Sequence, residues 1–399
     1  MVIKNKSSKL KLINYVKAID LNNINEIYLS EGIVTLKPKG NETEYASLDC
    51  KDCIVTPGFI DPQINGLDDC DFWQFPKFEK IDELRLKLAL SGTVAFCPTI
   101  ITEEKEKVIK LIEHLNEYLK QAKSETGAKI LGIHLEGLFI TKYGVHKSNY
   151  VLNELTIENI EPFIKDNVII FTLAPELDKS GEVIKFLQKK NILVSIGHSN
   201  ASYSEGELVI KKHGLNCVTH MFNALKGIDG FSHRSSNTSN INILELKLKN
   251  ENTIKPEVDG IALSILKNKN VLCMVIPDGV HINKEVIDFL YRLKGKEYFA
   301  LVTDMVSRDF FDLAKSQGNL GGGQSTLEKC VSNLSEWGIC NIEDALICAS
   351  RPISNKLKIA KEMGLGQLSF EKKANITLWD TKKNRVKGTI IGENIFLNY

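Results

Sequence analysis

The stretch Ile130-Leu131-Gly132-Ile133-His134-Leu135-Glu136-Gly137 is an apolar run of strand length that ends in polar residues. Seven similar runs occur between residues 58 and 303, and helical patterns separate several of them. The eight runs are Gly58–Ile64, Thr93–Cys97, Ile130–His134, Val168–Leu173, Ile192–Ile196, Asn216–Thr219, Val271–Ile276 and Tyr298–Thr303. Mostly continuous apolar runs are typical of strands buried on both faces of a parallel sheet. Eight strand–helix units in about 300 residues fit an α/β fold of the (β/α)8 TIM-barrel type better than an open sheet.

The two ends of the chain differ from this middle part. Residues 26–36 contain short apolar pieces broken by Asn, Gly and Lys, and Ala374–Trp379 and Gly388–Ile391 have a similar pattern near the C-terminus. Short strands with polar turns between them are typical of small β domains. The sequence therefore predicts one small β domain built from residues 1–55 and 372–399, beside a barrel of residues 56–371.

Composition limits the classes of partner. The 399 residues carry 51 Lys+Arg and 50 Asp+Glu, which leaves no charge surplus to hold nucleic acid or an anionic membrane non-specifically. No apolar run approaches the roughly 18 residues that a membrane span needs, and the N-terminal residues lack an apolar signal core. We therefore expect a cytoplasmic protein with a small-molecule partner. Nine cysteines, including a lone Cys50/Cys53 pair, do not suggest a disulfide framework or a zinc finger.

Reactive groups of such barrels lie at the C-terminal ends of the strands and in the loops that follow. Any one histidine there is more often a hydrogen-bonded structural residue than a ligand. Several of them together, with carboxylates, indicate a site. The residues that we expect to converge at one mouth of the barrel are His134, Glu136, His198, His220, His281 and Asp304.

Three of these residues suit a metal ion. Glu136, His198 and His220 would supply one carboxylate oxygen and two imidazole nitrogens, a suitable set for Zn²⁺ or Fe²⁺ with a position left for water. Such a metal lowers the pKa of its water towards about 7. Asp304 could take the proton from that water and later hand it to a leaving amine.

At this point the sequence resembles a known family. The segment Val55-Thr56-Pro57-Gly58-Phe59-Ile60-Asp61 is similar to the start of the barrel in the amidohydrolase superfamily. Further stretches, in the same order along the chain, resemble the N-acetylglucosamine-6-phosphate deacetylase family from about residue 55 to 380. They are His134-Leu135-Glu136-Gly137, Gly197-His198-Ser199-Asn200-Ala201, Thr219-His220-Met221-Phe222-Asn223-Ala224, Asp278-Gly279-Val280-His281 and Leu301-Val302-Thr303-Asp304.

The resemblance implies a β-sandwich beside a metal-dependent barrel. It also implies hydrolysis of the N-acetyl group of a 6-phosphorylated amino sugar to acetate and the free amine. The enzyme would be a homodimer whose neighbouring subunit helps to bind phosphate. Glu136, His198 and His220 match the metal ligands, with one divalent ion per subunit: zinc, or alternatively iron, cobalt or manganese. Asp304 matches the catalytic acid and base.

The same resemblance implies substrate contacts. His281 matches a histidine that contacts the substrate, and we expect it to donate to the carbonyl oxygen as charge develops there. His146 matches a substrate-contacting histidine in the loop after the third barrel strand. Asn223 and Ala224 match the segment that meets the sugar phosphate. Arg234 matches the arginine that reaches phosphate, within its own subunit or across the dimer.

The sequence departs from the family pattern at several positions. Gln63 and Asn65 stand where some members carry the His-x-His pair of a second metal, which argues for one metal per site. Leu138 replaces the proline that usually follows the Glu-Gly pair, and Ser235-Ser236-Asn237 replaces Glu-Pro-Gly. Gly321-Gly322-Gly323-Gln324-Ser325 is a drifted form of an Ala-Gly-Ser motif. These differences lie mainly in the segments that would contact the substrate, whereas the predicted metal ligands and Asp304 are all present.

Other functions stay open at this stage. A related barrel could act on N-acetylgalactosamine 6-phosphate, a cyclic imide or an N-acyl amino acid. From a different class, the chain could be an inactive sugar-phosphate-binding protein or a regulator. The presence of all three ligands together with Asp304 argues against lost catalysis.

Overall fold

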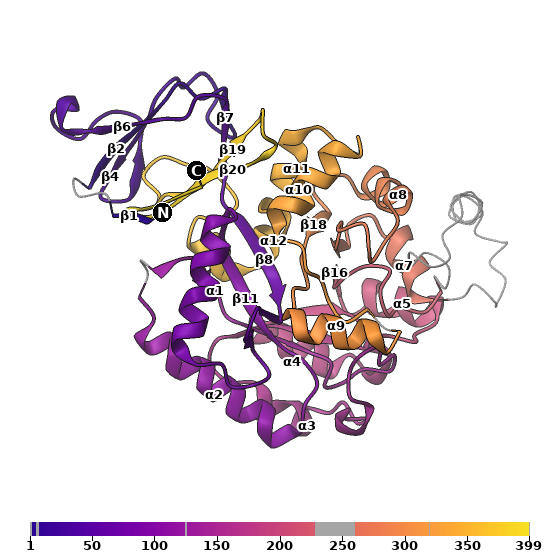
Figure 1. Ribbon diagram of the computed structural model, residues 1–399. Helices are drawn as coiled ribbons and strands as arrows, with labels where there is room; N and C mark the ends of the chain where they lie inside the picture. Colours follow the sequence, from indigo (N-terminus) through magenta and orange to yellow (C-terminus); the bar gives the residue numbers. More distant parts are fainter. Residues whose placement is uncertain (1, 5–7, 124–125, 228–259, 319, 399) are drawn as a thin grey trace.

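Eight parallel strands in the described part of the chain form a barrel (Figure 1). The structure is a computed structural model that describes residues 2–4, 8–123, 126–227, 260–318 and 320–398. In the order of hydrogen-bonded neighbours, the strands are β8 (Phe59–Ile64), β11 (Thr93–Ile100), β13 (Ile133–Glu136), β14 (Val168–Leu173), β15 (Leu193–Ile196), β16 (Cys217–Val218), β17 (Leu272–Val275) and β18 (Phe299–Leu301). Met305, beyond β18, forms a parallel bridge with Ile64 of β8, which joins the last strand to the first. The predicted (β/α)8 barrel is confirmed.

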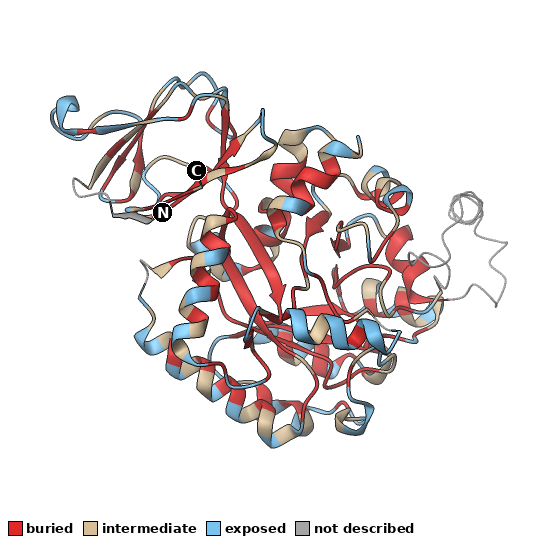
Figure 2. Cartoon of the chain, viewed as in Figure 1, coloured by how far each residue is buried: buried red, intermediate tan, exposed pale blue. Residues whose placement is uncertain are grey.

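The barrel strands are apolar because both of their faces are covered. Every residue of β8 and β11 is buried, and Figure 2 shows the buried strands inside a ring of half-exposed helices. Helix α2 (Lys105–Gln121) illustrates the outer ring, since it buries one apolar stripe that includes Val108 and Leu115 and exposes its charged face. The other barrel helices of more than four residues are α1 (Phe78–Leu90), α4 (Glu182–Lys189), α5 (Tyr203–Lys211), α7 (Ile261–Lys267), α8 (Lys284–Lys294) and α9 (Arg308–Ser316).

Further helices follow the barrel towards the C-terminus. They are α10 (Leu327–Glu336), α11 (Ile342–Cys348), α12 (Arg351–Lys356) and α13 (Lys358–Glu362). Helices α2, α4, α5 and α8 lie between successive barrel strands, as the helical patterns between the apolar runs predicted. None of the described helices is both long and apolar enough to cross a membrane.

The two chain ends build two further sheets, which lie together at one side of the barrel (Figure 1). One sheet contains β1 (Val2–Lys4), β21 (Asn394–Leu397), β20 (Arg385–Ile391), β19 (Asn375–Asp380), β7 (Cys53–Pro57) and β3 (Lys17–Ala18). The other contains β5 (Ile33–Thr35), β4 (Ile27–Ser30), β2 (Lys9–Ile13) and β6 (Ala46–Asp49). The antiparallel pairing of β19 with β7 joins the two chain ends, as a sandwich from both termini requires. The domain limits 1–55 with 372–399, and 56–371, stay a prediction.

The sandwich packs against the beginning of the barrel strands. Trp379 of β19 contacts Phe59 at the start of β8, with ring centroids 6.3 Å apart. The hydroxyl of Thr377 donates to the carbonyl of Gly92, just before β11, over 2.7 Å. The sandwich therefore leaves the opposite, C-terminal ends of the strands free for a site.

Cys50 and Cys53 belong to this sandwich. Both thiols are buried and unbridged, and their sulfur atoms lie within hydrogen-bond distance of the carbonyls of Leu48 and Lys51. Burial raises the pKa of the Cys50 thiol to about 12 and that of Cys53 to about 11. Thiols held protonated in this way suit a structural role rather than metal ligation.

Candidate active site

The predicted site residues meet in one pocket of about 280 Å³ at the C-terminal end of the barrel. The predicted residues that line it are Glu136, His146, His198, His220, Asn223, Ala224, His281 and Asp304. Arg234 and the segment Ser235–Asn237 lie outside the described residues. An apolar wall that includes Val145 and Phe310 completes the pocket.

Three potential ligand atoms gather at one point of the pocket. The Oε1 atom of Glu136, at the end of β13, is 2.9 Å from Nε2 of His220 and 3.6 Å from Nε2 of His198. The two imidazole nitrogens are 3.2 Å apart. Atoms that bind one tetrahedral ion at about 2 Å lie about 3.3 Å from each other. These residues therefore fit the divalent metal that the resemblance implies.

The backbone is strained where these side chains leave the strands. His198, His220 and Asp304 have φ angles of 49°, 26° and 50°, a region that non-glycine residues rarely adopt. Each such residue costs about 1–3 kcal/mol and persists only where its surroundings hold it in place. All three residues in this backbone conformation line the same pocket.

The imidazole of His198 is oriented from behind. Its Nδ1 is 2.8 Å from the carbonyl oxygen of Lys142, and the backbone N–H groups of Thr141 and Lys142 donate to the carbonyl of His198. A carbonyl partner requires Nδ1 to carry the proton, which leaves Nε2 of His198 as the free donor atom for a metal. The Nδ1 of His220, in contrast, has no hydrogen-bond partner among the residues that the structure describes.

The charges in this cluster stabilise one another. Burial opposes ionisation of Glu136, but hydrogen bonds and positive charge from His198 and His220 outweigh it and hold the pKa of this carboxyl well below its usual range. Burial likewise disfavours the charged form of His220, yet the hydrogen bond and negative charge of Glu136 raise its pKa to about 9. The cluster thus attracts positive charge, as a cation site requires.

Gln63 and Asn65, both buried at the end of β8, serve the carboxylates directly. The Nε2 of Gln63 donates to Glu136 Oε2 over 2.9 Å and to Asp304 Oδ1 over 2.8 Å. The Nδ2 of Asn65 donates to the same oxygen of Asp304 over 2.6 Å, and the hydroxyl of Thr219 donates to Gln63 Oε1. The amide of Gln63 thus lies between the two carboxylates, while that of Asn65 bonds to Asp304 alone. These are the two residues that stand where some members of the resembled family carry a His-x-His pair.

Asp304 has the environment of a group that exchanges protons. Burial, followed by the negative charge of Glu136, raises the pKa of its carboxyl above the ordinary value. The bonds from Gln63 and Asn65 both end on Oδ1. The pKa of a general acid and base is tuned in this manner towards the working pH.

His281 forms a pair with Asp278 that sequence reasoning did not single out. The Nδ1 of His281 is 2.7 Å from Asp278 Oδ2, and the other oxygen of Asp278 accepts from the N–H groups of Val280 and His281. The Nε2 of His281 is buried in the pocket wall without a partner among the described residues. The three-residue spacing within Asp278-Gly279-Val280-His281 was the available signal, because an Asx turn of that length brings the two side chains together.

Glu176 is a second residue whose contribution the sequence did not reveal. Its carboxylate accepts from the hydroxyl of Ser199 over 2.6 Å, from the N–H of Asn200 over 2.8 Å and from the hydroxyl of Thr141. It therefore ties together the loops after β13 and β15, which carry His146 and His198. Its position in Ala174-Pro175-Glu176, directly after β14, was the only signal.

One expected residue does not reach the pocket. His134 lies deeper in the barrel, where Nδ1 is 3.0 Å from the carbonyl of Pro62 and Nε2 is 2.8 Å from the hydroxyl of Thr172. The expectation that it joins the mouth is wrong. In β13, residues 134 and 136 point to the same side, but His134 is two residues earlier and belongs to the layer below Glu136.

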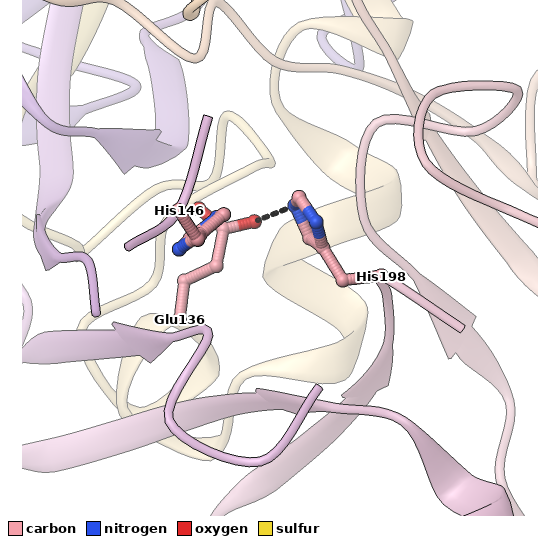
Figure 3. Close-up of side chains that lie close together, drawn as sticks. All are labelled: Glu136, His146 and His198. Atoms are coloured by element: carbon pink, nitrogen blue, oxygen red, sulfur yellow. Dashed lines mark ion pairs between the residues drawn. The ribbon is translucent and has the colours of Figure 1, made fainter. Parts of the chain in front are cut away.

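His146, which the resemblance assigns to the substrate, also lies beside the predicted metal ligands. Glu136, His146 and His198 each offer one ligand atom, and these atoms all lie within 4.8 Å of one another (Figure 3). The rings of His146 and His198 meet edge to face, with centroids 4.3 Å apart. Burial, followed by the charge of His198, lowers the pKa of His146 to about 3, so its imidazole is neutral.

The structure defines the class of the protein as an α/β barrel with a candidate metal site, in which a carboxylate and two imidazoles gather at the C-terminal ends of the strands. N-acetylglucosamine-6-phosphate deacetylase of Haemophilus influenzae is 30% identical over 308 residues, which cover 75% of this chain and 72% of the relative. The chain therefore belongs to the N-acetylglucosamine-6-phosphate deacetylase family. A member from Bos taurus is 28% identical over 379 residues, covering 87% of this chain and 85% of its own.

A solved structure supports the fold. The N-acetylglucosamine-6-phosphate deacetylase of Pasteurella multocida superimposes with a TM-score of 0.80 at 23% identity, over 98% of this chain and 100% of the other. No family model matches the chain.

Proposed function

We propose that this chain removes the N-acetyl group of N-acetylglucosamine 6-phosphate by hydrolysis, giving glucosamine 6-phosphate and acetate. The observation that carries this function is the meeting of Glu136, His198 and His220 within 2.9–3.6 Å of one another. Asp304 adjoins them through its shared bond with Gln63. The names of the relatives in the family supply the substrate.

Glu136 Oε1 and the Nε2 atoms of His198 and His220 would hold one divalent cation, zinc in the first place. Iron, cobalt and manganese suit the same oxygen and nitrogen donors. When bound, such a cation activates water and polarises a carbonyl oxygen. The amide groups of Gln63 and Asn65 favour one cation per subunit, because they bond to the carboxylates that a second cation would need.

Asp304 would carry the proton transfers of the reaction, and His281 would assist at the carbonyl oxygen of the substrate. Asp304 takes a proton from the attacking water and passes it to the departing nitrogen, so that the C–N bond breaks to a free amine. His281, held by Asp278, turns Nε2 towards the substrate and donates to the carbonyl oxygen when its ring is protonated at both nitrogens.

The sugar phosphate would lie along the segment of Asn223 and Ala224, which lines the same pocket. His146 would contact the sugar, and Arg234 would pair with the phosphate. We further propose a cytoplasmic homodimer in which Arg234 reaches the phosphate in the same or the neighbouring subunit. Sedimentation equilibrium of the full chain tests the dimer, and a monomer at micromolar concentration would contradict it.

Amine release from metal-loaded protein tests the function. The substrates are N-acetylglucosamine 6-phosphate and N-acetylgalactosamine 6-phosphate, with both unphosphorylated sugars as controls. We expect fastest release from the gluco epimer and little from sugars without phosphate. Faster release from the galacto epimer would change the substrate, and no release from any of them with zinc, iron, cobalt or manganese would overturn the function.

A further inference from the structure

We propose that His146 is a fourth protein ligand of the metal in the substrate-free enzyme, bound through Nε2. This inference rests on the metal site of the proposed function and adds to it a ligand from the loop after β13. In this state the cation would be enclosed by Glu136, His146, His198 and His220. Water or substrate would then enter only when His146 gives up its position.

The first support is the placement of the imidazole. His146 shares a group of ligand atoms within 4.8 Å with Glu136 and His198, and its ring packs edge to face against that of His198. Figure 3 shows the carboxylate of Glu136 and the two imidazoles gathered at one place. His220 Nε2 lies 2.9 Å from Glu136 Oε1, so that three imidazoles, those of His146, His198 and His220, lie near this carboxylate.

The second support is the hydrogen bond behind His146. A metal-binding histidine donates its other ring N–H to a neighbouring acceptor, which fixes the tautomer and aims the free nitrogen at the ion. The Nδ1 of His146 is 2.8 Å from the hydroxyl of Thr102, and it also accepts a longer bond of 3.5 Å from the backbone N–H of Thr102. Metal binding through Nε2 requires the tautomer in which Nδ1 donates to the nearer hydroxyl oxygen, because Nε2 then keeps a free lone pair. His198 has the same arrangement with the carbonyl of Lys142.

The third support is a space made for the ring. Gly137, directly after Glu136, has φ of 99°, and a Cβ there would lie 2.3 Å from His146 Nδ1 and 2.3 Å from the Thr102 hydroxyl oxygen. Only glycine lets the His146–Thr102 pair approach the ligand strand this closely. His146 is 7% exposed, so its ring is part of the wall and does not extend into solvent.

Four ligands around one ion have a chemical consequence. Sites with four protein ligands are closed, whereas catalytic sites keep a position for water. Ligand atoms about 2 Å from an ion are about 3.3 Å apart, so the group within 4.8 Å must contract slightly on binding.

The experiment compares His146→Asn with the unmodified chain and with His281→Ala as a matched control from the same pocket. An Asn side chain places an amide near the position of Nδ1, so it keeps the bond to Thr102 and removes only Nε2. Each protein is stripped with a chelator, checked for folding by circular dichroism and loaded with one equivalent of Zn²⁺. X-ray absorption counts the imidazole ligands, and chelator competition gives the zinc affinity.

We expect three imidazoles in the unmodified chain and in His281→Ala, but two in His146→Asn. We also expect zinc affinity to fall at least tenfold in His146→Asn alone, with added free imidazole restoring the third nitrogen. Two imidazoles in the unmodified chain, or unchanged affinity in His146→Asn, would overturn the inference. If His146→Asn does not fold, His146→Ala with free imidazole gives the same comparison.

Amine release from N-acetylglucosamine 6-phosphate, measured on the same preparations, separates the two proposals. If the unmodified enzyme is active but its zinc has only two imidazole ligands, His146 is not a ligand and the proposed function still stands. If the zinc of the unmodified protein has three imidazole ligands but no deacetylation is detected, His146 is a ligand and the proposed function is wrong.

Discussion

The side-chain amide of Gln63 donates to the carboxylate of Asp304 over 2.8 Å, at the point where the last barrel strand meets the first. The same nitrogen donates to Glu136, so that one neutral side chain fixes the positions of two buried carboxylates relative to each other. A shared donor of this kind lowers the repulsion between the carboxylates without a second cation. The relationship explains how an active site can carry Gln and Asn where a metal-binding pair would otherwise stand.

Loss of this shared donor should weaken catalysis and stability together. We expect Gln63→Leu to lower turnover by about 10–100-fold and the free energy of unfolding by about 1–3 kcal/mol, because two buried carboxylates each lose a hydrogen bond. Steady-state kinetics and urea unfolding measure the two effects. Thr219→Val is the matched control, since it removes only the hydroxyl that donates to Gln63 Oε1 and should have the smaller effect. Equal effects in both variants would contradict this role of Gln63.

Asp304→Asn should separate catalysis from metal binding. An asparagine can still accept the bonds from Gln63 and Asn65 and tolerates the φ of 50°, so we expect a folded protein that keeps its metal. Without a carboxylate to move protons, turnover should fall by about 10²–10⁴-fold. Metal analysis and an amine-release assay on the same sample provide the check. Turnover near that of the unmodified chain would show that another group is the acid and base.

Glu176 should control metal affinity without touching the metal. We expect Glu176→Ala to weaken zinc binding by about 10–100-fold, because it frees Ser199, Asn200 and Thr141, which hold the loops around His198. Glu176→Gln keeps an acceptor oxygen, so its zinc affinity should lie between that of Glu176→Ala and that of the unmodified chain. Competition with a chelator measures the affinity. If Glu176→Ala binds zinc as tightly as the unmodified chain, the loops are held by other contacts.

Trp379 should make the sandwich and the barrel unfold as one cooperative unit. It is fully buried against Phe59, and its indole N–H has no partner within the described part of the chain. We expect Trp379→Ala to cost about 3–5 kcal/mol and Trp379→Phe only about 1 kcal/mol, because phenylalanine refills most of the space and removes an unsatisfied N–H. Thermal unfolding should show one transition for both variants. Two separate transitions would mean that the sandwich and the barrel unfold independently.

Much of this protein follows from local patterns. Each barrel strand is a short apolar run, and the polar residue at its end must lie at the same rim as the others, because parallel strands share one direction. Glu136, His198, His220 and Asp304 could therefore be grouped from the sequence, although up to 168 positions separate them in the chain, from 136 to 304. The strand-rich ends were equally clear, since turn residues interrupt them at short intervals.

The sequence by itself determined that this chain forms a barrel, which residues stand at its rim and which family it resembles. Only the tertiary structure decided which rim side chains touch, as the layers within a strand and the torsions of each loop depend on packing from distant segments. Thus His134 turned out to bond within the barrel, Gln63 joined two carboxylates, and His146 came to lie beside His198. Contacts of this kind depend on atomic positions to within about an ångström, and the spacing of residues along the chain does not determine positions that closely.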